Sequence, residues 1–173
     1  DLVRYVTGKP NAVSVMASTF NHLGMKPEMK GLDRYLSKDY DPENPYNDVE
    51  DAAVAIIKFD NGITLFFETS WVLHTKESQN YLTLYGDKAG VQMEPTLEFY
   101  KEDGRNYFVE ERPLIKEDEN KMVAIFDRQI THFIDCIVNG TECRNPGEDG
   151  VEVMKILDAI YKAAETGHEV KIK

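Results

Sequence analysis

The chain has 173 residues, and its 31 acidic residues outnumber its 20 basic ones, for a formal net charge of −11. This balance excludes a nucleic-acid partner and binding to an anionic membrane surface, because both need clustered cations. No apolar run approaches the ~20 residues that a membrane helix needs. With 42% hydrophobic and 29% charged residues, the chain has an ordinary globular composition. We therefore expect a soluble, acidic, cytoplasmic domain.

The first residues of the chain have the pattern of the end of an amphipathic helix. Apolar residues recur within Asp1–Val6, Gly8 stands where a left-handed C-cap is wanted, and Pro10 prevents continuation. Neither an N-cap nor an initiator methionine precedes this helix, so we expect the chain to be a piece of a longer protein. The alternation of Asn11–Asn21 then predicts a strand. A polar loop at Gly24–Asn47 follows, and loops of that length are usually functional or mobile.

The clearest prediction is a β-hairpin. Its strands are Glu50–Phe59 and Ile63–His74, and Asn61-Gly62 between them supplies the two positive-φ residues of a type I′ turn. Both faces of this hairpin carry large apolar side chains, whereas a half-solvated sheet alternates more cleanly. We therefore expect both faces of the sheet to be covered.

Periodicity and turn residues predict further strands and two long helices after this hairpin. We expect the helices to place apolar stripes against the rest of the domain, with most of the second one buried. The remaining predicted strands are Tyr81–Tyr85, Ala89–Met93, Leu97–Lys101, Tyr107–Glu111 and Glu169–Ile172, and the helices are Ile125–Val138 and Gly147–Thr166.

Spacing alone identifies no catalytic, cofactor or metal site. The sequence contains neither Gly-x-Gly-x-x-Gly nor Gly-x-x-x-x-Gly-Lys-Ser/Thr. By their spacing Cys136 and Cys143 make neither a disulfide framework nor a zinc site, and Cys136 lies in an apolar helical pattern where a buried, inert thiol is expected. His132 is interpreted as one half of a helix-surface pair with Asp135.

Two other features are interpreted as packing and solvation rather than as ligand sites. Trp71, the only tryptophan, lies in the apolar hairpin and is expected to pack in a core or an interface, rather than to form a substrate platform. The acidic residues Asp48, Glu50 and Asp51 straddle a loop–strand junction. We interpret them as a solvated strand entry rather than as a divalent-ion site.

The C-terminal part carries recognisable family motifs. Phe133–Ile137, Pro146–Gly150 and Ile156–Tyr161 resemble the Gfo/Idh/MocA family of NAD(P)-dependent oxidoreductases. The resemblance extends in the right order over essentially the whole chain. The other matching segments are Asp1-Leu2, which resembles the end of the family's His-x-x-Asp-Leu signature, Val49–Ala53 with Phe59–Gly62, and Gly86–Gly90.

The resemblance implies that residues 1–173 are the C-terminal substrate-binding and oligomerisation domain of a longer, two-domain dehydrogenase. The family's other half is a Rossmann domain with the glycine fingerprint and a catalytic lysine, and neither is found here. The signature histidine would precede Asp1. We therefore expect NAD or NADP to bind the full-length parent and not this fragment, and no catalytic residue in this chain. The implied substrate is a small molecule, a sugar, a polyol or a related hydroxyl compound.

The implied fold is α+β, a two-layer sandwich of a largely antiparallel open sheet with helices on one face. In the family the other face commonly packs against a second subunit, which would explain the two-faced hairpin. We expect a dimer or tetramer through the face that carries Phe67 and Trp71, or through that carrying Phe66 and Val72. The missing Rossmann domain is the other expected partner.

Four residues in two loops are candidate substrate ligands. Arg34 and Tyr46 lie in the long loop, and His74 and Lys76 lie in the connection that follows the hairpin. They carry the donors or aromatic faces that bind hydroxyl-rich molecules, on loops that leave strand ends. The alternative from another class is a free-standing, non-catalytic α+β binding or assembly module, because some relatives of the family have lost activity.

Overall fold

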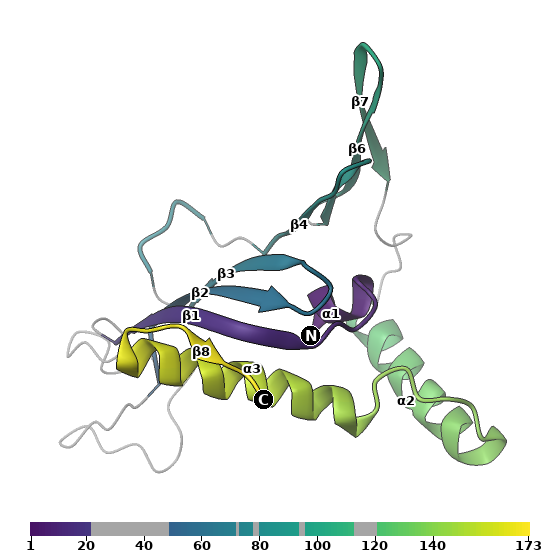
Figure 1. Ribbon diagram of the computed structural model, residues 1–173. Coiled ribbons are helices and arrows are strands. Elements are labelled where there is room, and N and C mark those ends of the chain that lie inside the picture. Colours follow the sequence, from purple (N-terminus) through teal and green to yellow (C-terminus); the bar gives the residue numbers. More distant parts are fainter. Residues whose placement is uncertain (22–48, 72, 78–79, 94–95, 113–120) are drawn as a thin grey trace. The chain divides into compact units, whose positions relative to one another are not determined.

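The protein is represented by a computed structural model (Figure 1). Its helices and antiparallel strands confirm the expected α+β class. The sequence predicts one open sheet, and the described strands divide between two four-stranded sheets. The structure describes residues 1–21, 49–71, 73–77, 80–93, 96–112 and 121–173.

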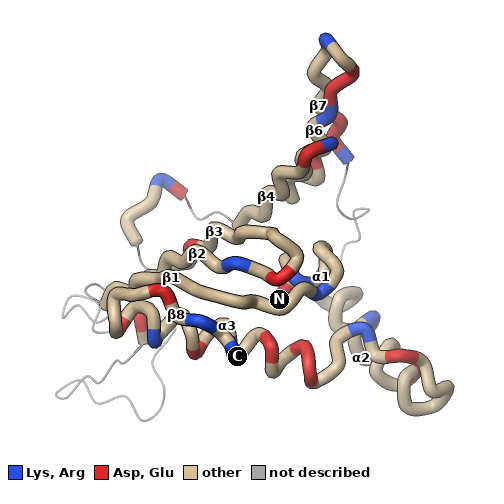
Figure 2. Tube along the Cα trace, in the orientation of Figure 1, with Lys and Arg blue, Asp and Glu red and all other residues tan. Residues whose placement is uncertain are grey.

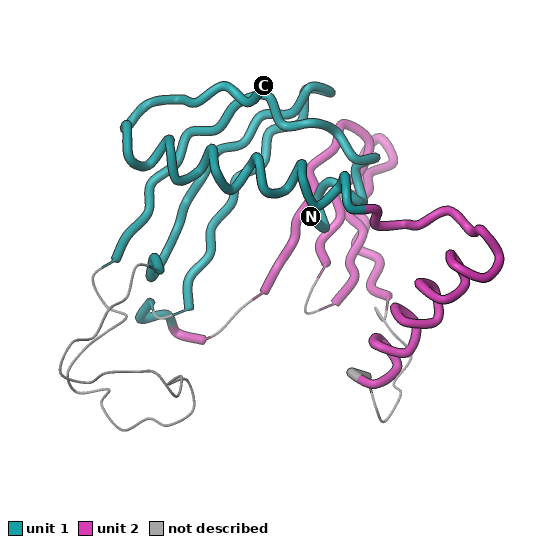
Figure 3. Tube along the Cα trace, turned by 90° about the horizontal axis from the view of Figure 1, so that it is seen from below, with its two compact units in different colours: residues 1–75, 147–173 teal, residues 76–146 magenta. Residues whose placement is uncertain are grey.

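The chain divides into two compact units, which are described separately (Figure 3). Unit 1 comprises residues 1–75 and 147–173, and unit 2 comprises residues 76–146. In unit 1 one antiparallel sheet has the strand order β3-β2-β1-β8. Its elements are α1 (Leu2–Val6), β1 (Ala12–Phe20), β2 (Ala52–Phe59), β3 (Thr64–Ser70), α3 (Gly147–Thr166) and β8 (Val170–Lys171).

The β2–β3 hairpin forms where the sequence predicts it, with a different turn. Only Gly62 has a positive φ, of 88°, whereas a type I′ turn would need the same of Asn61. The Phe59 amide donates to the Ile63 carbonyl oxygen (2.9 Å), and the Gly62 amide donates to that of Phe59 (3.1 Å). This is a three-residue loop that ends on a left-handed glycine, so the type I′ prediction is wrong.

The core of unit 1 lies between one face of the sheet and helix α3. Val15 on β1 and Ala163 on α3 are completely buried, and Ile57, Phe59 and Ile160 are nearly so. Phe67 of β3 packs against the same cluster. Small alanines on α3 allow the helix to approach the sheet closely, and alternation along the strands supplies the apolar side.

The opposite face of this sheet is exposed, and we call it the outer face. Met16, Ile56 and Phe66 stand in one cross-strand row of it, and Phe66 is 79% exposed. Val54, in the next row, is also exposed. Phe66 therefore lies on the uncovered side and Phe67 on the covered side. Of the two faces considered for self-association, the one that carries Phe67 is already packed within this chain, and Val72 lies outside the described residues.

A buried arginine ties the start of the chain to helix α3. Arg4 is 4% exposed, and its Nε donates to the carbonyl oxygen of Pro10 (2.9 Å). Its Nη1 lies 3.6 Å from Oδ1 of Asp149, and Nζ of Lys9 lies 2.5 Å from Oδ2 of the same carboxylate. Gly8 has a φ of 88°, as expected of a residue that ends a helix.

Unit 2 contains an antiparallel sheet of strand order β4-β5-β6-β7 and one long helix. Charged side chains of this sheet gather on the β6–β7 hairpin, and β4 and β5 carry none (Figure 2). None of the described residues of unit 2 is buried. Its elements are β4 (Leu82–Tyr85), β5 (Gly90–Met93), β6 (Leu97–Asp103), β7 (Asn106–Arg112) and α2 (Lys121–Asn139).

The two faces of the second sheet differ in character. Leu84, Val91 and Phe99 are cross-strand neighbours on an apolar face. On the other face, Tyr100 stacks on Tyr107 with the ring centroids 6.3 Å apart. The Tyr100 hydroxyl donates to the Glu98 carboxylate (2.5 Å), and this bond raises the pKa of Tyr100 to about 12.

Fewer side chains of the two long helices are buried than the sequence predicts. On α2 the apolar stripe of Phe126, Ile130, Phe133, Ile134 and Ile137 forms, but each of these residues is more than half exposed. On α3 only Ala159, Ile160 and Ala163 are buried, so the expectation that most of this helix is buried is wrong. Among the described helices, none combines the length and the apolarity needed to cross a bilayer.

Candidate functional site

The first sheet brings the roots of both candidate loops to one edge. In the register of the sheet, Phe20 at the end of β1 pairs with Ala52 at the start of β2, and Ala52 pairs with Ser70 at the end of β3. The chain therefore leaves β1 after Phe20 and enters β2 at Ala52 beside the point where it leaves β3 after Ser70. We call this the loop edge, defined by Phe20, Glu50–Ala52, Ser70, Trp71 and Leu73–Thr75.

Hydrogen bonds hold the chain firmly as it leaves β3. The Ser70 hydroxyl donates to the Asp51 carbonyl oxygen (2.9 Å), and it accepts from the Leu73 amide (3.0 Å). The Trp71 indole nitrogen donates to the Glu50 carbonyl oxygen (2.9 Å). Trp71 itself is 56% exposed, so it is anchored by its indole nitrogen rather than buried in a core.

One of the acidic residues at the loop edge, Asp51, is not solvated as the sequence predicts. Asp51 is 1% exposed, and its amide donates to the Phe20 carbonyl oxygen (2.6 Å). The Glu50 carboxylate accepts from the Tyr161 hydroxyl of α3 (2.7 Å). The interpretation as solvated residues is therefore wrong for Asp51. Strand periodicity cannot reveal this burial, because it shows which face of a strand a residue lies on and not what covers that residue. Asp48 lies outside the described residues.

Two of the four predicted substrate ligands lie within the described residues. His74 and Lys76 are exposed in the segment that follows β3. Arg34 and Tyr46 lie outside the described residues. The structure thus places the bases of both candidate loops at one edge.

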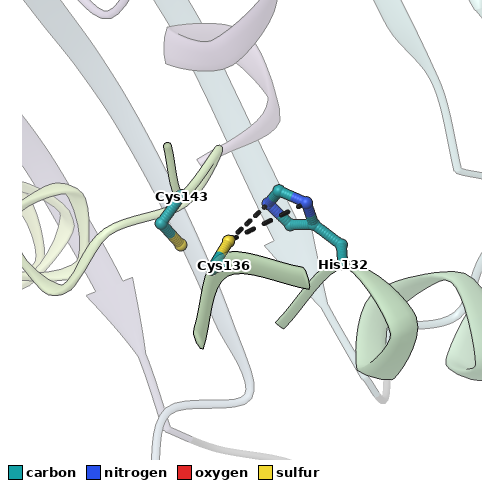
Figure 4. Close-up of side chains that lie close together, drawn as sticks. All are labelled: His132, Cys136 and Cys143. Carbon is teal, nitrogen blue, oxygen red and sulfur yellow. Dashed lines mark hydrogen bonds between the residues drawn. The ribbon is translucent and has the colours of Figure 1, made fainter. Parts of the chain in front are cut away.

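A second grouping of reactive side chains lies at the end of α2 (Figure 4). Sγ of Cys136 is 3.6 Å from Nε2 of His132, one helical turn away. One ligand atom each of His132, Cys136 and Cys143 lies within 4.8 Å of the other two, and all three residues are partly buried. The spacing i, i+4 of His132 and Cys136 is the signal that sequence reasoning passed over, since it stacks two side chains on one helix face.

His132 acts electrostatically on Asp135, as the expected pair implies, and each of the two side chains makes its hydrogen bonds to other residues. The Asp135 carboxylate accepts from the Asn139 amide and the Thr141 hydroxyl, both at 2.7 Å, and these bonds lower its pKa. His132 instead accepts from the Arg144 backbone amide (3.1 Å). Burial raises the pKa of the Cys136 thiol, and the neighbouring Cys143 adds to the shift.

Comparison with known proteins gives consistent matches along the whole chain. The family model for the C-terminal alpha/beta domain of the Gfo/Idh/MocA oxidoreductase family matches residues 1–172. D-glucoside 3-dehydrogenase of Escherichia coli K12 is 29% identical over 173 residues, which are 99% of this chain and 46% of that protein.

Solved structures show the same fold at lower identity. Aldose-aldose oxidoreductase from Caulobacter crescentus, complexed with glycerol, has a TM-score of 0.66 at 23% identity, covering 98% of this chain and 44% of that one. The WlbA dehydrogenase from Bordetella pertussis, in complex with NADH and UDP-GlcNAcA, has a TM-score of 0.61 at 16% identity, covering 99% and 41%.

The chain thus spans about half the length of the relatives it matches, and the matched half is their oxidoreductase C-terminal domain. The resemblance noted in the sequence is confirmed over its full extent. The family model, the α+β fold and the order of the motifs agree, and the chain belongs to the Gfo/Idh/MocA oxidoreductase family as its C-terminal alpha/beta domain.

Proposed function

We propose that this chain is the substrate-binding and oligomerisation domain of a dehydrogenase that oxidises or reduces a sugar, a polyol or a related hydroxyl compound. The observation that carries the proposal is the match along the whole chain to a D-glucoside 3-dehydrogenase. The printed names of two structural relatives, an aldose-aldose oxidoreductase and a dehydrogenase complexed with a sugar nucleotide, support the same substrate class. We also propose a cytoplasmic location, on the composition alone.

The dinucleotide is proposed to bind a part of the full-length protein outside these 173 residues. A nicotinamide dinucleotide is usually held by a glycine-rich turn and the helix N-terminus that follows it. No such glycine fingerprint occurs in this sequence, so these residues do not fit the cofactor. The NADH named with one structural relative supports NAD or NADP as the cofactor of the full-length protein.

The loop edge is proposed as the substrate side of this domain. Two loops root there on a rigid sheet, and one of them begins in a segment pinned by Ser70 and Trp71. A rigid scaffold under polar loops is a common arrangement for binding sites. His74 and Lys76, with Arg34 and Tyr46 of the long loop, supply donors and aromatic faces for a hydroxyl-rich ligand.

Steady-state kinetics of the full-length protein test this assignment. We expect His74→Ala and Tyr46→Phe each to raise KM and to leave kcat within about tenfold, because such groups bind ground and transition states alike. Lys76→Ala should behave similarly, and Lys88→Ala, an exposed lysine in the β4–β5 turn, is its matched control. A fall of kcat by about a thousandfold at unchanged KM would make these residues chemical participants. A wild-type protein without turnover of sugars or polyols with NAD or NADP would favour the non-catalytic binding module.

The outer face of the first sheet is proposed as the surface through which copies of the chain associate. Met16, Ile56 and Phe66 form one apolar row there, and a contiguous exposed apolar patch of this kind marks an interaction site. Light scattering at ~50 μM should show a dimer or tetramer, at a concentration above a μM-range dissociation constant. Phe66→Glu should dissociate it, and Tyr85→Glu on the other sheet should not. A wild-type monomer would contradict the proposal.

A further inference from the structure

The cluster of His132, Cys136 and Cys143 is assembled by local hydrogen bonds rather than by chance proximity. Gly140 has a left-handed φ of 67°, which ends α2 and reverses the chain. The Asp135 carboxylate then holds Asn139 and Thr141 on either side of that glycine. The chain is thereby returned along the last turns of the helix that it has just left.

A further bond fixes the imidazole at the same place. The Arg144 amide donates to Nε2 of His132 at 3.1 Å, so the residue after Cys143 is tied to the ring. Cys143 is thus carried back to the helix face that presents His132 and Cys136. The three side chains come from one segment of twelve residues, 132–143.

The donor atoms have the spacing of metal ligands. With Zn–S and Zn–N bonds of about 2.3 and 2.05 Å, a tetrahedral site separates a sulfur from a nitrogen by about 3.5 Å. Sγ of Cys136 lies 3.6 Å from Nε2 of His132. All three donor atoms fall within 4.8 Å of one another, so small side-chain shifts bring them around one ion, which takes the Nε2 lone pair of His132 in place of the Arg144 amide hydrogen.

The type of donor selects the type of ion. Two thiols and an imidazole are soft ligands that favour Zn²⁺ over the hard cations Mg²⁺ and Ca²⁺, which take oxygen. Two thiolates and a neutral imidazole balance the charge of a divalent cation. The Asp135 carboxylate accepts hydrogen bonds at both oxygens, so it is not placed as a fourth ligand.

We propose that His132, Cys136 and Cys143 bind one Zn²⁺ ion per chain, with water in the fourth position. The ion ties the C-terminal end of α2 to the segment after it. Such a link matters in unit 2, where none of the described residues is buried and a metal can stabilise what a small core does not.

Cobalt is the probe that reports both binding and its ligands. The full-length protein is stripped of metal by a chelator, kept reduced with a phosphine and titrated with Co²⁺. We expect one equivalent to bind, with thiolate-to-cobalt charge transfer in the near ultraviolet and visible bands of tetrahedral Co²⁺. Added Zn²⁺ should abolish both signals. Chelation should also lower the thermal unfolding midpoint of the native protein.

Substitutions then identify the ligands. Cys136→Ser and Cys143→Ser should each remove about half of the charge-transfer intensity and weaken Co²⁺ binding by more than roughly 100-fold, because loss of groups that merely orient ligands already costs 10–100-fold. His132→Gln should weaken binding comparably but keep the charge-transfer band at saturating cobalt. His168→Gln, an exposed histidine on unit 1, is the matched control and should bind normally. Circular dichroism confirms that each variant folds.

Three outcomes would overturn the proposal. The first is the absence of thiolate absorption at one equivalent of Co²⁺ in the reduced, folded protein. The second is binding that survives both serine substitutions, which would place the ion elsewhere. The third is formation of a Cys136–Cys143 disulfide on air oxidation in a protein whose reduced form binds no Co²⁺. That result would identify a redox-active thiol pair instead.

Discussion

The two units of this chain differ in what happens to their apolar faces. In unit 1, α3 covers one side of the first sheet, and all the buried hydrophobic residues of the described structure are found there. In unit 2 the second sheet and α2 are amphipathic too, yet their apolar side chains stay partly or largely exposed. Amphipathic periodicity therefore shows which side of an element is apolar and does not show what covers that side.

The charged residues make the same contrast. Arg4 in unit 1 is buried and bonded to a carbonyl oxygen and to Asp149. Arg112 in unit 2 pairs with Glu110 on a surface where the two side chains are 61% and 45% exposed. Solvent screens the exposed Arg112–Glu110 pair and not the buried Arg4–Asp149 pair. The buried pair should therefore contribute much more to the free energy of unfolding.

The largest effect is expected from removing a core ring. Phe59→Ala leaves a cavity in unit 1 and should cost about 3–5 kcal/mol of the free energy of unfolding. Phe126→Ala, the same change on the exposed stripe of α2, should cost less than about 1 kcal/mol. Urea unfolding of the full-length protein, followed by circular dichroism, measures both. Equal losses of unfolding free energy would show that the α2 stripe is covered in the assembled protein, and the contrast between the two units would not hold.

The next effect concerns the buried arginine. Arg4→Met removes a donor to Pro10 and leaves Asp149 with Lys9 alone, so we expect a loss of about 2–4 kcal/mol, toward the range for a broken buried pair. Arg112→Met should change stability by less than about 0.5 kcal/mol. The same urea experiment decides between them. If Arg4→Met were neutral, the link between the chain start and α3 would be dispensable.

A smaller effect is expected at two turns, where the two units should respond alike. Gly62 in unit 1 and Gly104 in unit 2 both have a positive φ and open space around the position of an added Cβ. Alanine at either position should therefore cost about 1 kcal/mol, from backbone strain alone. Thermal unfolding of the two variants should give similar shifts. A much larger shift for one of them would show a contact that the turn alone does not explain.

The smallest effect on stability is expected at Tyr100, where the change is followed through the ionisation of the phenol. Its pKa is raised from 10.0 to about 12, chiefly by its hydrogen bond to Glu98, so the bond stabilises the fold below pH 10 and is lost as the pH rises through about 12. Glu98→Gln should move the Tyr100 transition toward 10, as seen in a phenolate absorbance titration. Glu142→Gln, at an exposed carboxylate in the segment after α2, is the control. An unshifted transition in Glu98→Gln would assign the raised pKa to another cause.

Much of unit 1 follows from local sequence rules, and the candidate site follows from them only in part. Gly8 and Gly62 adopt the left-handed conformation that their positions predict. The prediction of a type I′ turn is wrong because an Asn-Gly pair also fits a three-residue loop. Only the register of β2 and β3 distinguishes the two turns. His74 and Lys76 could be proposed from their place after a strand. That the two candidate loops share one edge follows only from the pairing of β1, β2 and β3.

Local sequence patterns are enough to predict the order of the elements, the bounds of α3 and the family, because periodicity, caps and motifs are local properties of the chain. Packing between distant segments, by contrast, covers Phe67 while Phe66 stays exposed, and it buries Asp51. The tertiary structure also brings Cys143 beside His132 and Cys136. Each of these depends on which distant segment packs against a residue, and periodicity carries no information about that partner.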